Sequence, residues 1–461
     1  MSALPLPPVT AGVLDLIGRT PLVELTRFPL GPCRLFVKLE SQNPAGSIKD
    51  RIALTMIATA EAEGRLMPGG TLVEATAGNT GLGLALVAAA KGYRLILVIP
   101  DKMALEKINH LRALGAEVRI TRSDVGKGHP AYYQDMAKRI AAENPGAVFV
   151  NQFENPANPR AHEETTGPEI FEQMGGDIDA VVVGVGSGGT LTGLGRYFRR
   201  VSPKTRMILA DPEGSVLAPL IATGRLGQAG SWLVEGIGED FVPAICDLSL
   251  VSQAFTVPDQ EAFMTARDLL RLEGLLGGSS TGTLLAAALR YARAQAAPQR
   301  IVTLLCDSGN KYLSKMYNDY WMRDQGFLAP ERKGDLRDLV SRRHDEGGTV
   351  TVGPEDSLLT AYNRMRVSDV SQLPVLEGDK VIGLLDESDL LLGVLEHGGK
   401  FSDPVSSAMI SRLETVPVDA PIARLTELFA KDHVALITEG SKFIGLITRI
   451  DLLNHLRRRM R

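Results

Sequence analysis

Short apolar runs alternate with helical patterns from about residue 34 to residue 308. Runs such as VVVGV (Val181–Val185) are continuously apolar, which is typical of strands covered by helices on both faces. Segments such as 104–114, which ends before Gly115, fit the helices between them. The pattern predicts an α/β fold with a doubly wound parallel sheet, divided into two lobes because of its length. The predicted strands are Arg34–Glu40, Thr71–Thr76, Arg94–Pro100, Glu117–Thr121, Ala147–Asn151, Ala180–Val185, Arg206–Ala210 and Arg300–Cys306.

The end of the chain contains an internal repeat. LPVLEGDKVIG (Leu373–Gly383) aligns with ALITEGSKFIG (Ala435–Gly445) at an offset of 62 residues. Each copy predicts the order β-α-β-β-α, and we expect two such small units to pack against each other. A charged, proline-containing stretch precedes them and indicates a linker. The predicted boundaries are a large domain at 1–325, a linker at 326–340, and repeats at 341–399 and 400–461.

The composition of the chain argues against several classes of protein. Of the 461 residues, 50 are Lys or Arg and 54 are Asp or Glu, so the net charge of −4 does not favour a nucleic-acid partner. The three cysteines lie far apart without CxxC spacing, so no metal site and no disulfide framework is expected. The longest apolar stretch, Gly81–Ala90, ends at Lys91 and is too short to span a bilayer. The N-terminus also lacks the pattern of a signal peptide, so we expect a cytoplasmic protein without a membrane partner.

Lys49 in NPAGSIKDR (Asn43–Arg51) is the first residue that indicates chemistry. An exposed helical lysine is the ordinary interpretation. However, the motif places this lysine at a helix start, where the helix dipole disfavours positive charge. The same field lowers the lysine pKa and favours the neutral amine that Schiff-base chemistry needs.

Three glycine-rich turns each precede a helix. EATAGNTGLG (Glu74–Gly83) exposes backbone N–H groups that suit a carboxylate, and Asn79 adds a side-chain donor. GVGSGGT (Gly184–Thr190) contains GxGxxG, with Asp211 at a later strand end. That spacing fits a dinucleotide site, and the same turn equally fits a single phosphate group. EGLLGGSSTGT (Glu273–Thr283) places Ser280 where it either caps a helix or contacts a heterocycle nitrogen.

Taken together and in this order, the four motifs resemble the fold-type II pyridoxal-phosphate enzymes of the β-replacement family, over about residues 14–324. The resemblance implies a tryptophan synthase β-like catalytic domain and disfavours the dinucleotide alternative. It implies that Lys49 holds pyridoxal 5'-phosphate as a Schiff base, that Asn79 bonds its phenolate oxygen and that Ser280 faces its ring nitrogen. A neutral serine there makes the ring a weaker electron sink and favours β-elimination and replacement over transamination. The phosphate would lie among Gly186, Ser187, Gly188, Gly189 and Thr190.

The same resemblance implies a substrate pocket. Thr76, Ala77 and Thr80 would hold the substrate carboxylate, although most relatives have serine at the position of Ala77. Gln152 is a further pocket residue, and Glu235 and Glu239 would orient the amino group of a second substrate. DPEGS (Asp211–Ser215) and EGIGEDF (Glu235–Phe241) resemble the cystathionine β-synthases, whose animal members have tyrosine at the position of Glu239. We expect no haem, because the chain has neither their N-terminal haem-binding extension nor their CxxC motif.

The C-terminal repeat resembles a tandem pair of CBS domains (a Bateman module). In GLITRID (Gly445–Asp451), Thr448 and Asp451 would contact the phosphate and ribose hydroxyls of an adenosyl ligand. The first copy has Asp386 at the position of Thr448, and its carboxylate would repel a phosphate. S-adenosylmethionine, an adenine nucleotide, and no ligand with only a dimerisation role all remain open, as does the direction of any regulation.

The reaction that this family implies joins L-serine and L-homocysteine to give L-cystathionine and water, through an aminoacrylate, in transsulfuration. Cysteine in place of serine would release hydrogen sulfide. One alternative is a cysteine synthase that uses O-acetylserine and sulfide. The other is a ligand-sensing regulatory protein with an inactive catalytic lobe. A homodimer or higher homo-oligomer is implied by the family.

Overall fold

The computed structural model describes residues 9–76, 78–101, 105–126, 128–328, 333–395, 399–431 and 433–459. The chain forms two compact units, Met1–Leu313 (unit 1) and Ser314–Arg461 (unit 2). The relative placement of the two units is not determined.

Unit 1 contains two open sheets. Apart from the antiparallel β1–β2 pair, all neighbouring strands in both sheets are parallel. The larger sheet has the order β1 (Leu22–Leu25), β2 (Arg34–Leu39), β10 (Arg300–Leu305), β7 (Ala180–Val183), β8 (Arg206–Pro212) and β9 (Val251–Val257). The smaller sheet has the order β5 (Glu117–Thr121), β4 (Arg94–Pro100), β3 (Thr71–Glu74) and β6 (Val148–Phe149).

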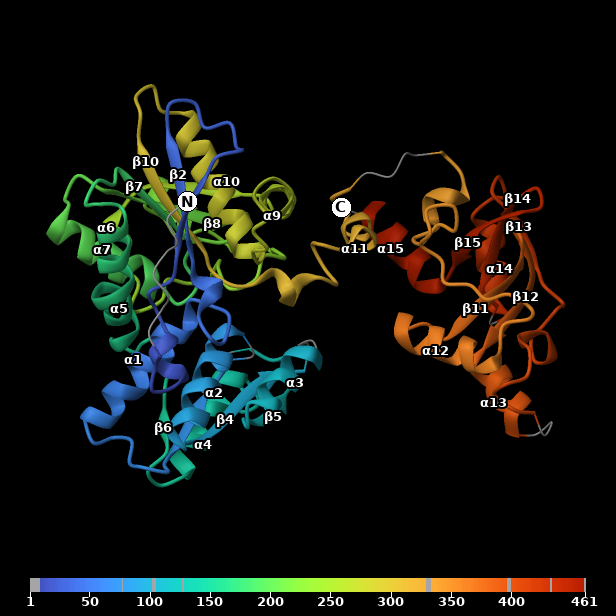
Figure 1. The fold of residues 1–461 in the computed structure, drawn as a ribbon, viewed down its shortest axis with the longest axis horizontal. Helices are drawn as coiled ribbons and strands as arrows, with labels where there is room; N and C mark the ends of the chain where they lie inside the picture. Colours follow the sequence, from blue (N-terminus) through green and yellow to red (C-terminus); the bar gives the residue numbers. More distant parts are fainter. Residues whose placement is uncertain are drawn as a thin grey trace. The chain divides into compact units, whose positions relative to one another are not determined.

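Helices cover both faces of the sheets, as the continuous apolar runs predict. In β4, Leu97 packs with the cluster that includes α1 and α2, whereas Val98 packs with the cluster that includes α4. Both side chains are fully buried. Figure 1 shows α9 and α10 against the larger sheet and α2, α3 and α4 around the smaller one. These findings confirm the two-lobed, doubly wound fold class.

Four of the helices of unit 1 begin in the motifs that the sequence analysis singled out, namely those that start at Lys49, Asn79, Gly189 and Ser279. The α-helices are α1 (Lys49–Ala62), α2 (Asn79–Lys91), α3 (Leu105–Ala113), α4 (Tyr133–Glu143), α5 (Ala157–Ala161), α6 (Gly167–Gln173), α7 (Gly189–Val201), α8 (Leu217–Thr223), α9 (Asp259–Glu273) and α10 (Ser279–Arg293). The short turns are η1 (Val13–Leu16), η2 (Glu40–Gln42), the π-helical η3 (His162–Thr166), η4 (Leu248–Leu250) and η5 (Gly309–Tyr312).

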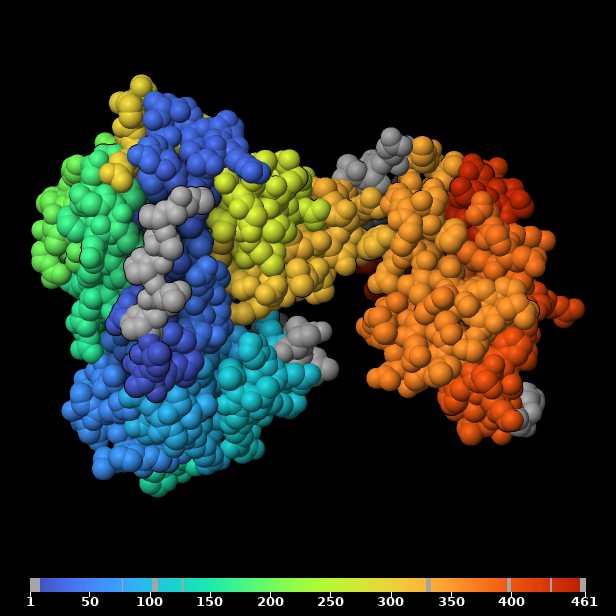
Figure 2. All heavy atoms as spheres, in the orientation of Figure 1, coloured from blue at the N-terminus to red at the C-terminus, as the bar shows by residue number. Residues whose placement is uncertain are grey.

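The two ends of the chain of unit 1 meet in the larger sheet. β10 lies between β2 and β7, so a late segment pairs with one of the first strands. Figure 2 shows the corresponding blue and gold atoms side by side at the upper edge of unit 1. All eight predicted strands are present, with ends that differ by up to two residues, whereas β1 and β9 were not predicted. Both are edge strands with partly exposed residues, and neither has a continuous apolar run.

Unit 2 contains the two repeats. The second has the predicted order β13 (Thr415–Pro417), α14 (Ala423–Ala430), β14 (Ala435–Glu439), β15 (Lys442–Ile447) and α15 (Arg449–Arg459). The first has α12 (Leu358–Ser368), β11 (Gln372–Glu377), β12 (Lys380–Asp386) and α13 (Glu387–Leu395), while its first strand is reduced to a bridge between Val352 and Val375. α11 (Asp319–Asp324), η6 (Leu336–Leu339) and η7 (Val405–Ser407) complete the unit.

The repeats match in detail and pack together. The register shifts after Val375 in the first hairpin and after Ile437 in the second, at the same offset of 62 that the sequence shows. Leu376 and Val381 form one buried cluster with Leu436 and Phe443. The expected linker at 326–340 ends inside the fold, because Leu336, Leu339 and Val340 are buried in the core of the second repeat.

Among the described residues, no helix is long and apolar enough to cross a membrane. The same residues include no group of three His, Cys, Asp or Glu side chains arranged to hold a metal ion.

Candidate active site

A cavity of about 270 Å³ lies in unit 1, outside the carboxyl ends of parallel strands. Ligands of open α/β sheets bind at this edge. Its lining comes from the starts of α1, α2, α7 and α10 and from residues that follow β6 and β10. The cavity brings together most of the site residues predicted from the sequence: Lys49, Thr76, Asn79, Thr80, Gln152, Gly186, Ser187, Gly188, Thr190, Glu239 and Ser280.

Three predicted residues are placed differently. Ala77 lies outside the described residues. Gly189 begins α7 directly behind the lining. Glu235 lies between the lining residues Val234 and Gly236, but its carboxylate forms an ion pair with Lys107 of α3.

Lys49 reaches the cavity from the first position of α1. Desolvation lowers the pKa of its amine, while the acidic groups of Cys306, Asp307 and Glu239 act in the opposite direction. The direction agrees with the dipole argument, but burial is the larger cause. The neutral, nucleophilic form of the amine is therefore more populated here than in water.

The turn after β7 leaves no room for a side chain at Gly186 or Gly188. A Cβ atom at Gly186 would lie 2.5 Å from the Gly236 carbonyl oxygen, and one at Gly188 would lie 2.4 Å from the Cβ of Cys246. Gly188 also has φ = +89°, in the left-handed region that favours glycine. Within the described part of the chain no side chain caps α7, so its first N–H groups remain for a ligand. This cradle fits an anionic group such as a phosphate.

Asn79 is held at the start of α2 by residues from the far end of unit 1. Its Nδ2 donates to Asp307 Oδ2 at 2.9 Å, and its Oδ1 accepts from Lys311 Nζ at 2.5 Å. Tyr312 donates its hydroxyl to the same Asp307 oxygen at 2.9 Å. An amide has two N–H bonds, so the Asn79 amide retains a second donor for a ligand in the cavity.

The turn before α2 is fixed by a short chain of hydrogen bonds. The Gly78 N–H donates to Thr76 Oγ1 at 3.2 Å, and Thr80 Oγ1 donates to Gln152 Oε1 at 2.7 Å. The backbone N–H of Gln152 in turn donates to the buried Glu74 at 3.2 Å. Gln152 therefore positions Thr80 as well as lining the cavity.

Ser280 and Cys306 form a pair on another wall. Ser280 is the second residue of α10, and its hydroxyl acts to lower the pKa of the Cys306 thiol. Burial raises the pKa of that thiol to about 12, so it stays protonated. The carbonyl of Cys306 accepts from the Ile48 N–H at 2.9 Å, which ties the end of β10 to the residue before Lys49. Sequence reasoning missed Cys306 as a pocket residue because it tested the cysteines only for metal and disulfide spacing.

Glu239 is the acidic group that lines the cavity. Burial raises its pKa to about 8, the negative charges of Asp240 and Asp211 act in the same direction, and Lys49 opposes them. At neutral pH the carboxyl is therefore mostly protonated in the absence of a ligand. A cationic group placed against it would favour its ionised form.

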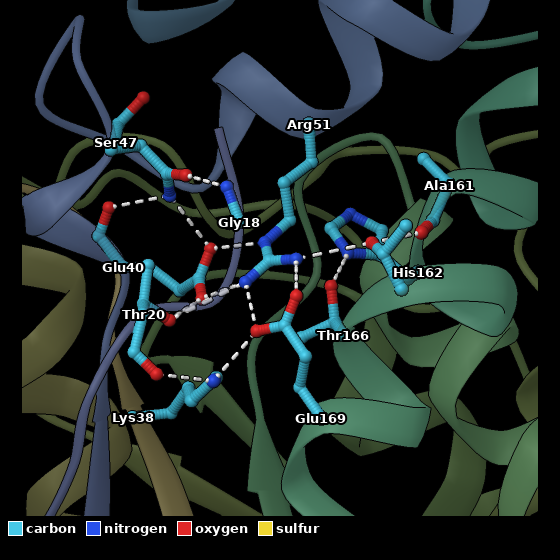
Figure 3. Close-up of polar contacts among 12 residues, drawn as sticks. Gly18, Thr20, Lys38, Glu40, Ser47, Arg51, Ala161, His162, Thr166 and Glu169 are labelled. Atoms are coloured by element: carbon cyan, nitrogen blue, oxygen red, sulfur yellow. Dashed lines mark hydrogen bonds and ion pairs between the residues drawn. The ribbon is translucent and has the colours of Figure 1, made fainter. Parts of the chain in front are cut away.

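A buried ion network lies next to the cavity and fixes α1, the helix that begins with Lys49 (Figure 3). Arg51 donates to Glu40 at 2.7 and 2.8 Å and to Glu169 at 2.7 Å through two nitrogens. Lys38 Nζ joins Glu169 at 2.7 Å. The surrounding cations hold the pKa of Glu169 at about 2 despite its burial. No local pattern predicts this network, because Lys38 and Glu169 are 131 residues apart in the chain.

Unit 2 contains several cavities, and one of about 310 Å³ lies at the start of α15. Thr448 and Asp451 line it together with Ser341 and Arg342. Asp451 Oδ2 accepts from the N–H of Thr448 at 2.7 Å and from its hydroxyl at 2.6 Å. In the first repeat, Asp386 and Asp389 form the corresponding pair.

Comparisons with known proteins identify a family for each of the two units. Residues 13–307 match the model of the family described as pyridoxal-phosphate dependent enzyme, and residues 337–396 and 405–458 match the CBS domain. The chain is 37% identical over 460 residues to a cystathionine β-synthase of Dictyostelium discoideum, covering 96% of this chain and 92% of that protein. It is 35% identical to the cystathionine β-synthase of Saccharomyces cerevisiae, covering 96% and 97%. It is also 44% identical to cysteine synthase A of Escherichia coli, over only 65% of this chain and 92% of that enzyme.

Two solved structures resemble unit 1. One is a hydrogen sulfide-producing enzyme from Fusobacterium nucleatum, with TM-score 0.61 and 37% identity over 66% of this chain and all of that one. The other is O-ureido-L-serine synthase, with TM-score 0.63 and 35% identity over 68% of this chain and all of that one. The chain belongs to the pyridoxal-phosphate dependent enzymes. Within them it belongs to the cystathionine β-synthase family, because its similarity to those enzymes extends over the catalytic part and both CBS domains.

Pyridoxal phosphate is the cofactor of this family, and the cavity fits it. The cofactor requires a lysine with a lowered pKa, a glycine-rich turn whose backbone N–H groups can bind a phosphate, and an amide with a spare donor.

Proposed function

We propose that this enzyme condenses L-serine with L-homocysteine to give L-cystathionine and water. The observation that carries the proposal is the cavity in which Lys49, with a lowered pKa, faces two loops suited to anions. The choice of substrates is supported by the relatives, because the cystathionine β-synthases match nearly the whole chain, whereas cysteine synthase A matches only its catalytic part.

We assign the cofactor contacts as the resemblance implies. Lys49 holds the cofactor covalently, the Gly186–Thr190 turn binds its phosphate, Asn79 bonds the phenolate oxygen and Ser280 faces the ring nitrogen. When bound, pyridoxal phosphate supplies a carbonyl carbon that condenses with amines and a ring that accepts the electron pair of the Cα–H bond.

Lys49 then moves protons. After the amine of serine has replaced it, the freed Lys49 amine takes the Cα proton and assists the departure of water from Cβ. The homocysteine thiol gives its proton to Lys49 as the sulfur bonds to Cβ, and Lys49 passes that proton to Cα. The lowered pKa of Lys49 favours the neutral form that acts as base.

The remaining pocket residues orient the substrates. Thr76 and Thr80, with the backbone of the turn between them, bind the serine carboxylate, and Gln152 fixes Thr80. Glu239 binds the ammonium of homocysteine, which favours ionisation of this carboxyl. Glu235 acts on substrate orientation indirectly, because its carboxylate is held in an ion pair with Lys107.

A competition assay tests the proposal. The purified enzyme receives serine, O-acetylserine, homocysteine and sulfide together, and mass spectrometry resolves the products. Cystathionine as the main product supports the proposal. Cysteine as the main product would overturn it and establish the second candidate, a cysteine synthase, which the 44% identity to cysteine synthase A favours.

Release of hydrogen sulfide from cysteine uses the same groups, and the neighbour named a hydrogen sulfide-producing enzyme supports it as a further activity. Cysteine with homocysteine should yield cystathionine and sulfide in equal amounts. Lead acetate or a sulfide-selective electrode measures the gas, and the serine reaction, which releases water instead, is the control.

We propose an adenosyl ligand for the unit 2 cavity, with Asp451 at the ribose hydroxyls and Thr448 at a phosphate. We also propose a homodimer and a cytoplasmic location. Calorimetric titration with S-adenosylmethionine, AMP and ATP tests the ligand, and sedimentation tests the oligomer.

A further inference from the structure

Two buried side chains contact the anion cradle from behind. Asn158 of α5 donates through Nδ2 to Ser187 Oγ at 2.9 Å and to the Gln152 carbonyl at 2.8 Å. His162 of η3 lies with Nε2 at 3.2 Å from Thr190 Oγ1. The two residues are four apart in a continuous helical segment, so they share one face of it. Each thus contacts one of the two hydroxyl groups of the cradle.

These contacts have little freedom to shift. Asn158 is 1% exposed and His162 is fully buried. A Cβ at Gly189 would lie 1.8 Å from Asn158 Oδ1, and one at Gly193 would lie 2.7 Å from the Cβ of His162. The helical segment and the start of α7 are therefore packed at backbone distance, which only glycine permits.

The direction of the Asn158 hydrogen bond is fixed by chemistry. An amide nitrogen can only donate, so Ser187 Oγ accepts. The Ser187 hydroxyl then has its own proton available for another partner, and Ser187 lines the cavity.

The direction at His162 depends on its tautomer. Burial lowers the pKa of His162 well below its ordinary value, with the charges of Lys49 and Arg51 acting in the same direction, so the ring is neutral. Its Nδ1 is hydrogen-bonded to the hydroxyl of Thr166 (Figure 3), and the two atoms are 2.9 Å apart. When Thr166 donates to Nδ1, the ring proton is on Nε2 and Thr190 accepts. The Thr190 hydroxyl then also has a free proton for the cavity.

We propose that Asn158 and His162 are positioning residues that make the Ser187 and Thr190 hydroxyls donors toward the cofactor phosphate. Both hydroxyls accept from the helical segment on one side and donate into the cradle on the other. The inference rests on the proposed assignment of the phosphate to Gly186–Thr190.

The test uses the full-length apoprotein and three ligands: pyridoxal phosphate, pyridoxal and inorganic phosphate. Asn158→Leu and His162→Leu each remove one donor. We expect each variant to weaken the binding of pyridoxal phosphate about ten- to a hundredfold, because the hydroxyl that loses its donor also loses its hydrogen bond to the charged phosphate. The affinity for inorganic phosphate should fall in parallel. The affinity for pyridoxal, which lacks the phosphate, should stay unchanged. His162→Gln keeps a donor and should restore most of the affinity.

Double-mutant cycles identify the route of the effect. Asn158→Leu should have no further effect on phosphate binding in a Ser187→Ala background, and His162→Leu none in a Thr190→Val background. Thr166→Val removes the donor to Nδ1 and should weaken phosphate binding. Its matched control is Thr165→Val, because the neighbouring hydroxyl contacts Arg51 and the Ala161 carbonyl instead of the ring.

NMR of the unaltered apoprotein tests the tautomer without any variant. With histidine labelled by ¹⁵N, two-bond proton–nitrogen correlations should show the proton of His162 on Nε2. A proton on Nδ1, or equal losses of pyridoxal and pyridoxal phosphate affinity in the variants, would overturn the inference. If Ser187→Ala and Thr190→Val leave phosphate binding unchanged, the cradle assignment itself fails.

Discussion

Replacing Glu169 with glutamine tests the buried ion network. This carboxylate accepts from Arg51 and Lys38, and its pKa is about 2 instead of the ordinary 4.5. At about 1.4 kcal/mol for each pH unit, that difference corresponds to about 3 kcal/mol of stability. Removing one partner of a buried ion pair has a similar cost, because it leaves a buried charge uncompensated. We therefore expect Glu169→Gln to lower the free energy of unfolding of unit 1 by about 3 kcal/mol at pH 7.

The dependence on pH has a definite sign. The folded-state pKa is depressed, so the stabilisation is fully present above pH 4.5 and is lost as the pH falls from 4.5 toward 2. The wild type and Glu169→Gln should therefore differ most at pH 7 and converge below pH 4.5.

The assay can be restricted to unit 1. The chain has two tryptophans, Trp232 in the wall of the active-site cavity and Trp321 in unit 2. In a Trp321→Phe background, tryptophan fluorescence during urea unfolding follows unit 1. Glu163→Gln is the matched control, because Glu163 pairs at 3.3 Å with an arginine whose side chain is 64% exposed, and it should change stability by less than about 1 kcal/mol. A loss below 1 kcal/mol for Glu169→Gln, or a loss that is constant from pH 7 to pH 3, would refute the reasoning.

Three further predictions concern the active-site cavity. Lys49→Ala should abolish turnover and the visible Schiff-base absorbance, measured on protein incubated with the cofactor; retained activity would contradict the mechanism. Glu239→Gln mimics the protonated form of a group whose pKa is about 8, so the kcat/KM profiles of variant and wild type should coincide below pH 7 and separate above pH 8. Gly188→Ala should lower cofactor affinity at least about tenfold because of its φ of +89° and the nearby Cys246, whereas Gly175→Ala, with φ +65° and open space, should not; equal affinities would show that the turn can relax.

The sequence predicted those parts of the fold that depend on local pattern. Continuous apolar runs identified the buried strands, and the repeat at an offset of 62 identified two similar units. The edge strands β1 and β9 were not predicted, because their half-exposed sequences show neither a continuous apolar run nor a clear alternation of apolar and polar residues. The predicted first strand of the first repeat was wrong, because only an isolated bridge between Val352 and Val375 takes its place.

The candidate site was predictable where it lies in glycine-rich turns. Residues such as Lys49, Asn79 and Ser280 stand inside recognisable motifs, and the structure brings them into one cavity. Its supporting contacts were not predictable, because Asp307 and Lys311 reach Asn79 across more than 220 residues of chain. His162 and Asn158 likewise have no local signal, since their role depends on the packing of one helix against another.

The position of β10 has a consequence for synthesis on the ribosome. This strand lies in the middle of the larger sheet, yet it is the last strand of unit 1 to leave the exit tunnel. From β7 to β10 about 120 residues must be translated, which takes roughly 10 s at typical rates. During that time β2 and β7 have no partner at their facing edges, so the nascent chain exposes two apolar strands until Leu305 emerges. A translational stop or slow codons before residue 300 would prolong that exposure and make the unfinished chain a substrate for chaperones.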